Sequence, residues 1–240
     1  MIGVEYPIEL PCRAVVSDHD DTVIVSRRTE YPRMQHVGQI LGRPITRRQL
    51  DASWGKGMGD QCALLYGEAN REKAQEIHRE LAGQYPRIAQ LGCLDILADM
   101  EAHDMKLGIV SAHNAVSIRA ELVEIGINPA AFLFIHGDKE TSPYHKDDPR
   151  TFNPAIQILA EHGISPEETV YIGDDIRDLS ALAVGWGAIG VTTGVHSYGD
   201  FQAAGREYSG VERVPVVRSL ADIRVETGKL IVPPFVELAV

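Results

Sequence analysis

The sequence predicts an α/β fold with a parallel sheet that is interrupted by a helical insertion. From residue 94 onward, short apolar runs typical of strands alternate with segments of helical periodicity. Such alternation produces right-handed crossovers and a parallel sheet with helices on both faces. Between residues 26 and 91, by contrast, the periodicity is helical. We therefore expect a core domain made of residues 1–26 and 93–240, and a small helical domain made of residues 27–92.

The composition is that of an ordinary globular protein, with 44% hydrophobic and 24% charged residues among 240. The formal net charge of -11 argues against nucleic-acid binding, because phosphate backbones require clustered lysine and arginine. No stretch approaches the ~18 apolar residues of a membrane span, and the N-terminus does not resemble a secretory signal. We therefore expect a cytoplasmic protein that binds neither nucleic acid nor membranes, and whose scattered cysteines are reduced.

The first strand of the core ends in a cluster of carboxylates. The apolar run of residues 14–16 is followed by Asp18, Asp20 and Asp21, three acids within four residues. These acids repel one another, and a divalent cation held by carboxylate oxygens would offset their charge. One of them is also a candidate nucleophile. A solvent-exposed turn explains this stretch equally well when it is taken alone, because aspartate is common in turns.

The insertion is predicted to contain helices on both sides of a glycine-rich loop. One helix is expected over residues 34–41, and another has the apolar stripe Ala74, Ile77 and Leu81. Residues 53–60 contain three glycines and are expected to form a flexible loop. Such a loop is only a weak sign of phosphate binding, and a plain connection between two helices explains it as well.

Four further strands of the core are predicted from short apolar runs at residues 107–110, 132–135, 169–172 and 188–191. A helix is expected to start at Asn153 and Pro154 and to run to about Glu161. The apolar faces of the other helices are predicted to be Leu94, Leu97 and Met100; Val116, Ala120 and Val123; and Ile176, Leu179 and Ala183.

Polar side chains follow three of these strands at the point where each strand ends. They are Asp18 with Asp20, Ser111, and Asp174 with Asp178 nearby. Because the carboxyl ends of parallel strands lie on one edge of a sheet, we expect these groups to converge. Convergence makes a solvent-exposed turn a weaker explanation of the first acidic cluster.

These residues resemble the four motifs of the haloacid dehalogenase-like superfamily. Residues 18–22 have the D-x-D-x-T signature, Ser111 resembles the second motif, Lys146 the third, and residues 173–178 the G-D-x-x-x-D fourth motif. The match follows the family's order over residues 13–195. The insertion resembles the C1-type helical cap of phosphoglycolate phosphatases, phosphonatases and β-phosphoglucomutases. The resemblance thus implies a Rossmann-like core with such a cap.

The resemblance also implies roles for the acids. Asp18 would be the nucleophile that takes up the phosphoryl group. Asp20 would be the acid/base that protonates the leaving oxygen and then activates water. Mg²⁺ would be held by Asp18, the backbone carbonyl of Asp20, and Asp174, with Asp178 as a further ligand or a support.

Two groups are implied to contact the phosphoryl group. Ser111 would bind a phosphate oxygen, and Lys146 would neutralise charge on Asp18 and on the phosphoryl group. Asp147 stands where the family has proline, so Lys139 remains an alternative to Lys146.

Further residues are candidates for substrate contacts. Ala112, His113 and Asn114 follow Ser111, and Lys56 lies in the glycine-rich loop, although loop lysines are usually only solvated.

Three other polar residues have alternative roles. His19 is expected to face either the substrate or the sheet. Asp21 is expected to shape the turn rather than to bind metal. Asp175 supports the metal site or caps the following helix, and the sequence favours neither.

The implied function is a Mg²⁺-dependent phosphatase that hydrolyses a small phosphorylated metabolite through an aspartyl-phosphate intermediate. A sugar-phosphate mutase similar to β-phosphoglucomutase would use the same residues. Phosphonatases and dehalogenases are disfavoured because neither calls for Asp20, and a non-catalytic protein would be expected to have lost a core acid. The substrate and the oligomeric state do not follow from the sequence.

Overall fold

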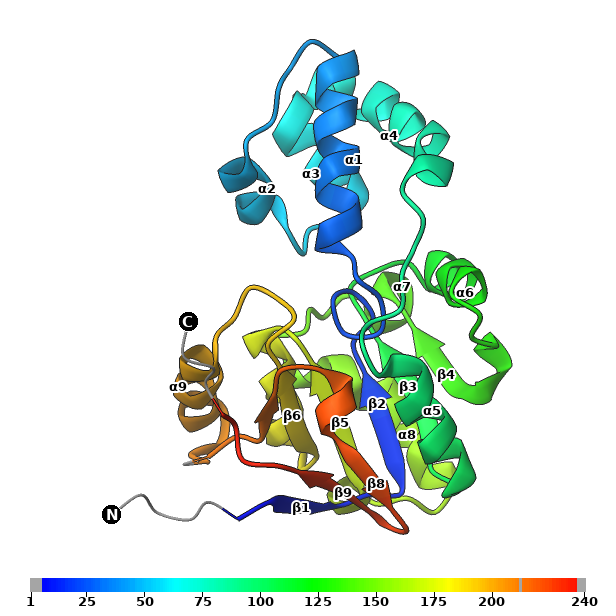
Figure 1. The fold of residues 1–240 in the computed structure, drawn as a ribbon, viewed down its shortest axis with the longest axis vertical. Helices are drawn as coiled ribbons and strands as arrows, with labels where there is room; N and C mark the ends of the chain where they lie inside the picture. Colours follow the sequence, from blue (N-terminus) through cyan, green and yellow to red (C-terminus); the bar gives the residue numbers. More distant parts are fainter. Residues whose placement is uncertain (1–5, 212, 237–240) are drawn as a thin grey trace. The chain divides into compact units, whose positions relative to one another are not determined.

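The computed structural model describes residues 6–211 and 213–236 (Figure 1). The chain divides into two compact units, Met1–Ile24 with Ala89–Val240 and Val25–Ile88. We call the first the core unit and the second the helical unit.

The core unit is built on a parallel sheet of six strands in the order β4-β3-β2-β5-β6-β7. The strands are β2 (Ala14–Ser17), β3 (Lys106–Val110), β4 (Phe132–His136), β5 (Thr169–Gly173), β6 (Gly187–Val191) and β7 (Val216–Val217). The four predicted runs after the insertion lie within β3, β4, β5 and β6. The predicted α/β fold with a parallel sheet is confirmed, and β2 lies between β3 and β5.

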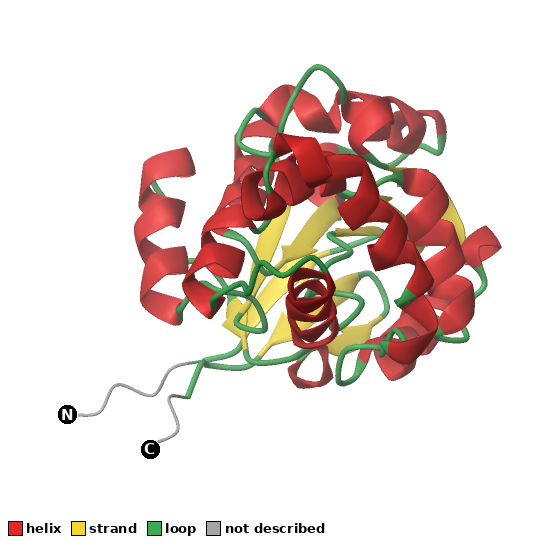
Figure 2. Cartoon of the chain, turned by 90° about the horizontal axis from the view of Figure 1, so that it is seen from above, coloured by secondary structure: helices red, strands yellow, loops and turns green. Residues whose placement is uncertain are grey.

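Helices flank this sheet on both faces (Figure 2). Val15 of β2 belongs to a hydrophobic cluster with residues of α5 and α6, whereas Ala14 and Val16 pack with α8. Successive side chains of a strand point to opposite faces, so these helices cover opposite sides of the sheet. The core helices are α5 (Cys93–Ala102), α6 (Ala115–Glu124), α7 (Asp138–Thr141), α8 (Asn153–Glu161) and α9 (Tyr198–Ser209), with 3₁₀ helices η3 (Pro129–Ala131), η4 (Pro149–Phe152), η5 (Pro166–Glu168), η6 (Ile176–Val184) and η7 (Leu220–Asp222).

The predicted apolar face of α6 is wrong. Val116 and Val123 are 76% and 63% exposed, whereas Ile118 and Leu122 are fully buried. The helix has apolar residues on more than one side, so the spacing alone does not select a face. The side of the helix with the larger aliphatic chains packs against the sheet, because burying these chains removes more apolar area from water. Similarly, Leu94 on α5 and Ala183 on η6 are exposed rather than buried.

A second, antiparallel sheet was not predicted from the sequence. It has the order β1-β9-β8 and joins segments from the two ends of the chain, β1 (Ile8–Pro11), β8 (Arg224–Glu226) and β9 (Lys229–Val232). Leu10, Leu230 and Val232 pack against the core cluster on the α5 face. The sheet therefore extends the core rather than forming a separate body.

The helical unit has a hydrophobic core of its own, which includes Met34, Val37, Leu50, Tyr66 and Ala74. Its helices are α1 (Arg27–Ile40), α2 (Arg47–Ser53), α3 (Met58–Tyr66) and α4 (Arg71–Glu80), with the 3₁₀ helices η1 (Glu68–Asn70) and η2 (Ala82–Gln84). The predicted stripe of Ala74, Ile77 and Leu81 is buried, as expected.

Two expectations for the helical unit need correction. The first helix begins at Arg27 rather than at residue 34 and contains Pro32, because burial of Tyr31 and its neighbours stabilises the turns before the proline. The glycine-rich loop is shorter than residues 53–60, since α3 begins at Met58. Gly59 lies inside α3, where an added Cβ would be 2.7 Å from the Arg71 guanidinium.

Candidate active site

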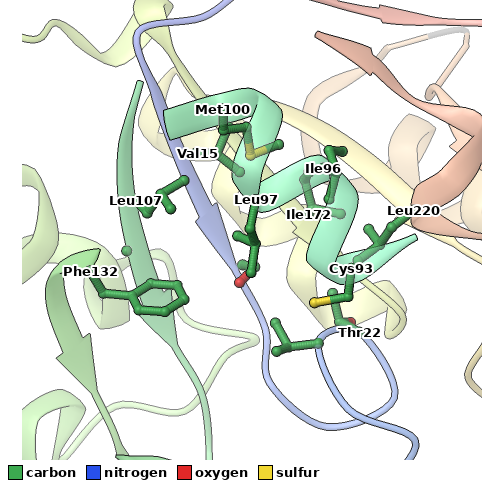
Figure 3. A pocket seen from close by; sticks show the side chains of 13 residues that line it. Val15, Thr22, Cys93, Ile96, Leu97, Met100, Leu107, Phe132, Ile172 and Leu220 are labelled. Atoms are coloured by element: carbon green, nitrogen blue, oxygen red, sulfur yellow. The ribbon is translucent and has the colours of Figure 1, made fainter. Parts of the chain in front are cut away.

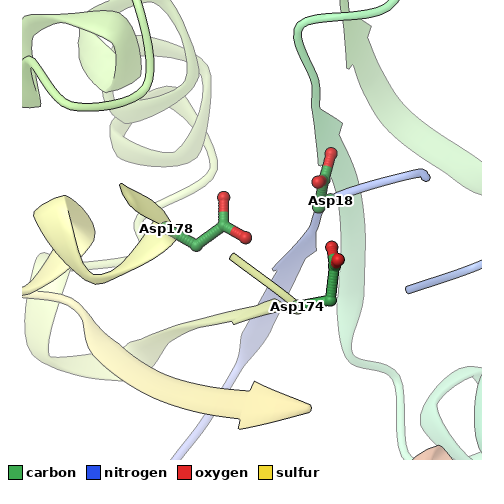
Figure 4. A group of neighbouring side chains, drawn as sticks. All are labelled: Asp18, Asp174 and Asp178. Carbon is green, nitrogen blue, oxygen red and sulfur yellow. The ribbon is translucent and has the colours of Figure 1, made fainter. Parts of the chain in front are cut away.

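Three buried carboxylates converge at the carboxyl ends of β2 and β5. Asp18 follows β2, Asp174 follows β5, and Asp178 lies in the first turn of η6 (Figure 4). One oxygen of each carboxylate lies within 4.8 Å of the others. The adjacent positions of β2 and β5 in the sheet order bring them together, as the sequence predicted. We call Asp18, Asp174 and Asp178 the acidic group.

The acidic group has the chemistry of a site for a divalent cation. Burial raises the pKa of Asp174 well above its ordinary value, and the charges of Asp18 and Asp178 raise it further. A divalent cation that prefers hard oxygen ligands would relieve this repulsion. The backbone also leaves room for these carboxylates: a Cβ on Gly194 would be 2.1 Å from Asp174 Oδ2, and one on Gly173 would be 2.0 Å from Asp178 Oδ2. The residues therefore fit a bound divalent metal.

Lys146 lies between two members of the acidic group. Its Nζ is 2.6 Å from Asp18 Oδ2 and 2.8 Å from Asp178 Oδ1, and the side chain is buried. Burial alone would lower the pKa of this amine, but the charges of Asp178 and Asp18 hold it well above its ordinary value. The hydroxyl of Ser180 donates to the Lys146 carbonyl and fixes the backbone there. Lys139, the alternative left open by the sequence, is exposed on α7.

Asp175 caps η6. Its carboxylate accepts a hydrogen bond from the Arg177 N–H at 2.9 Å and pairs with the Arg177 guanidinium at 2.8 Å. Burial alone would raise its pKa, but the hydrogen bonds with His196 and Arg177 hold the pKa well below the usual range. The Asp175 N–H donates in turn to Asp178 Oδ2 at 3.1 Å. Of the two roles left open for Asp175, the structure favours the helix cap.

Asp21 shapes the turn, as expected. Its φ of 51° lies in the left-handed region, which aspartate tolerates better than most residues. Its carbonyl accepts hydrogen bonds from Thr193 Oγ1 at 2.5 Å and Gln90 Nε2 at 3.0 Å. These bonds hold the loop that presents Asp18 and Asp20.

The loop after β3 positions Ser111, Ala112, His113 and Asn114. Ser111 is buried and its hydroxyl accepts a hydrogen bond from the His113 N–H at 3.2 Å. Asn114 caps α6, since its side chain accepts hydrogen bonds from the N–H groups of residues 116 and 117. Ala112 is exposed. The side-chain oxygen of Asn114 therefore already has a structural role, which the predicted contact with substrate would have to share.

Asp20 and His113 face each other, with Asp20 Oδ2 3.8 Å from His113 Nδ1. Their side chains are 31% and 27% exposed, unlike those of the acidic group. This partial exposure suits a group that exchanges protons with a substrate and with water.

His19 faces the interior and not solvent. Its ring is fully buried, and Nε2 lies 2.7 Å from Glu121 Oε2 on α6. Sequence reasoning did not identify Glu121, although an acid within the apolar pattern of α6 was a signal for it.

Lys56 belongs to the other unit. It is exposed in the connection between α2 and α3. Its contact with a substrate remains a prediction.

A small apolar cavity of about 20 Å³ lies elsewhere, between α5 and the sheet (Figure 3). Its lining includes Val15, Ile96, Leu107 and Phe132 and none of the candidate catalytic residues. A space of this size is on the order of one water molecule. The cavity is a gap in core packing and not a substrate site.

Comparisons with known proteins agree with the four motifs. Residues 17–191 match the sequence profile of haloacid dehalogenase-like hydrolases. A phosphoglycolate phosphatase from Synechococcus elongatus is 27% identical over 168 residues, which cover 69% of this chain and 69% of that protein. None of the helices within the described residues is long and apolar enough to cross a membrane.

Solved structures show the same fold. A haloacid dehalogenase-like hydrolase from Bacteroides fragilis has a TM-score of 0.68 and 24% identity, covering 88% of this chain and 98% of that one. A protein assigned as a β-phosphoglucomutase from Thermotoga maritima has a TM-score of 0.70 and 15% identity, covering 88% and 95%. The predicted class of enzyme, a phosphoric monoester hydrolase, is confirmed. The chain belongs to the haloacid dehalogenase-like hydrolases.

Proposed function

We propose that this protein is a Mg²⁺-dependent phosphatase that hydrolyses a small phosphate monoester through an aspartyl-phosphate on Asp18. The observation that supports this most directly is the environment of Asp18. Its carboxylate lies 2.6 Å from the Lys146 ammonium and within 4.8 Å of ligand atoms of Asp174 and Asp178. A carboxylate beside a buried ammonium is suited to attack an anionic phosphoryl group, because the ammonium offsets part of the negative charge.

The first half of the reaction forms the phosphoenzyme. An oxygen of Asp18 attacks phosphorus while the bond from phosphorus to the leaving oxygen breaks. Asp20 gives its proton to that oxygen, so the alcohol leaves neutral. Ser111 is proposed to hold a phosphoryl oxygen, and Lys146 offsets the negative charge of Asp18 and of the transferred group.

The second half returns the enzyme to its starting state. Asp20, now a carboxylate, takes a proton from a water molecule as that water attacks phosphorus. The bond between phosphorus and the Asp18 oxygen breaks, inorganic phosphate forms, and Asp20 is protonated again. Asp20 therefore has to serve both steps from one position.

Asp18, Asp174 and the backbone carbonyl of Asp20 are proposed to hold Mg²⁺. Asp178 is better suited to support than to direct ligation, because its oxygens already accept hydrogen bonds from Lys146 Nζ and the Asp175 N–H. When bound, the ion would offset charge on the phosphoryl oxygens.

The substrate is proposed to be a small phosphorylated metabolite. The relative from Synechococcus elongatus is named for phosphoglycolate, which supports a small anionic ester of this kind. A sugar-phosphate mutase remains the alternative, and conversion of a phosphosugar into its isomer in the presence of a bisphosphate would identify it.

The test is phosphate release from p-nitrophenyl phosphate and from a panel of phosphorylated metabolites with Mg²⁺. We expect Asp18→Asn to abolish release. Asp95→Asn, which neutralises an exposed acid on α5, should leave it unchanged. Activity that survives Asp18→Asn, or that persists in EDTA, would overturn the proposed mechanism.

A further inference from the structure

A line of four side chains leads from Asp20 into the core unit. His113 Nδ1 lies 3.8 Å from Asp20 Oδ2, and His113 Nε2 lies 3.8 Å from Glu121 Oε1. The other oxygen of Glu121 is 2.7 Å from His19 Nε2. His113 therefore lies between two carboxylates, one proposed to act in the reaction and one buried behind it.

The buried end of this line is fixed. A carboxylate accepts hydrogen bonds, so the hydrogen of the His19 ring is on Nε2, where it points to Glu121. His19 Nδ1 is buried and has no hydrogen-bond partner among the described residues, so a proton there would be an unsatisfied buried donor. This contact holds Glu121 in one orientation.

Glu121 is an unusual residue for the buried side of a helix. Its side chain is 10% exposed, and burying a carboxylate is unfavourable unless partners satisfy it. His19 satisfies one oxygen, and the other oxygen faces His113. The contact with His19 thus fixes the Glu121 carboxylate, and its second oxygen points toward the His113 imidazole.

The backbone of His113 is also held in place. Its carbonyl accepts a hydrogen bond from the Asp138 N–H at 3.0 Å. Gly137 packs so closely that an added Cβ would lie 2.4 Å from the His113 carbonyl oxygen. Asn114 caps α6 at the next residue, so His113 and Glu121 are tied to one rigid element. The backbone that carries the imidazole beside Asp20 is therefore held in place.

We propose that His113 is a positioning residue for Asp20, and that Glu121, oriented by His19, holds His113 for this task. The inference rests on the proposed function, in which Asp20 donates a proton in one step and removes one in the next. Precise placement of an acid/base group strongly affects the rate. The imidazole restricts Asp20 to the orientation that both steps need.

The test separates proton donation from all other contributions. An alkyl phosphate needs its leaving oxygen protonated, whereas 2,4-dinitrophenyl phosphate has a leaving group that departs without a proton. The value of kcat/KM reports formation of the phosphoenzyme, the step in which Asp20 acts as an acid. We measure kcat/KM for both esters in wild type, Asp20→Asn, His113→Ala, His113→Asn and Glu121→Gln.

We expect Glu121→Gln and His113→Ala to lower kcat/KM for the alkyl ester about tenfold more than for the dinitrophenyl ester. His113→Asn keeps a polar group on the side of Nδ1 and should restore part of this difference. Glu101→Gln, which neutralises an exposed acid on α5, is the matched control and should affect neither ester. Circular dichroism and thermal unfolding of each variant check that it is folded.

The outcomes distinguish the two levels of the proposal. If Asp20→Asn does not discriminate between the esters, then Asp20 is not the acid and the proposed function is wrong in that step. Suppose instead that Asp20→Asn lowers kcat/KM more for the alkyl ester than for the dinitrophenyl ester. If folded His113→Ala and Glu121→Gln then lower kcat/KM equally for both esters, or for neither, the positioning role is wrong. Equal loss would instead indicate that His113 contacts the phosphoryl group.

Discussion

Glu30 is the centre of a buried charged cluster inside the helical unit. His78 Nε2 lies 2.6 Å from one oxygen, Arg33 Nη1 donates to the other at 3.0 Å, and the Arg87 guanidinium contacts the same oxygen. Burial alone would raise the pKa of Glu30. The hydrogen bond with His78 and the positive charges of Arg87 and Arg33 outweigh burial, and the pKa falls from 4.5 to about 2.

This shift makes stability depend on pH. One pKa unit corresponds to about 1.4 kcal/mol, so the drop from 4.5 to about 2 contributes about 3 kcal/mol to the free energy of unfolding at neutral pH. Because the folded-state pKa is the lower one, the contribution is fully present above pH 4.5 and is lost as the pH falls toward 2. By pH 3, about 2 kcal/mol of it should be gone.

The perturbation is Glu30→Gln, which removes the titrating group and keeps the shape. The free energy of unfolding is measured by urea denaturation between pH 7 and pH 3. The chain has two tryptophans, so Trp186→Phe leaves Trp54 as the single fluorescent reporter within the helical unit. Trp54 packs edge-on against Tyr31, with ring centroids 5.3 Å apart.

We expect the difference in unfolding free energy between this background and its Glu30→Gln variant to shrink by about 2 kcal/mol from pH 7 to pH 3. Glu76→Gln, at an exposed position of α4, should show a small difference that does not change with pH. A difference for Glu30→Gln that stays constant across this range would refute the reasoning, because the Glu30 pKa would then be the same in both states.

The remaining predictions concern the acidic group. Lys146→Met removes the positive charge beside it and should lower kcat/KM for phosphate release about 100-fold, whereas Lys139→Met should leave it within about twofold. Gly194→Ala puts a methyl group 2.1 Å from Asp174 Oδ2, so Mg²⁺ affinity measured by calorimetry should fall about tenfold; unchanged affinity would mean that Asp174 is not a ligand. Burial raises the pKa of Asp174 and, against the opposing charge of Lys146, that of Asp178 to about 7, so Mg²⁺ binding should release protons and tighten from pH 5 to pH 8. Equal binding enthalpies in buffers of different ionisation enthalpy would contradict this release.

The convergence of the acids follows from local patterns, because apolar runs that end in acids place those acids on one edge of a parallel sheet. The choice between Lys146 and Lys139 does not follow from local patterns. Both lie in polar sequence, and only the tertiary structure shows that Lys146 is buried against Asp18 and Asp178 whereas Lys139 is exposed. Sequence patterns report which residues follow a strand, but they do not report how an irregular loop folds back on it.

The wrong prediction of the apolar face of α6 also affected the prediction of the site residues. The stripe of Val116 and Val123 fits helical spacing as well as the stripe of Ile118 and Leu122 does, so periodicity does not select between them. Choosing the wrong stripe also concealed Glu121, which lies on the buried side. A buried acid that pairs with a histidine far away in the sequence becomes visible only when the tertiary fold brings the two together.

The charges of the site support the proposal that both a metal ion and Lys146 take part in the reaction. Asp18, Asp174 and Asp178 carry three negative charges when ionised, and Lys146 supplies one positive charge, so two negative charges remain uncompensated. A phosphate monoester brings further negative charge and would be repelled by such a site. Burial and the neighbouring negative charges raise the pKa values of Asp174 and Asp178, so ionising both of these acids at once is unfavourable. A divalent cation held by the acidic group would offset the two remaining negative charges, so electrostatics supports the proposed dependence on Mg²⁺ together with the oxygen ligands.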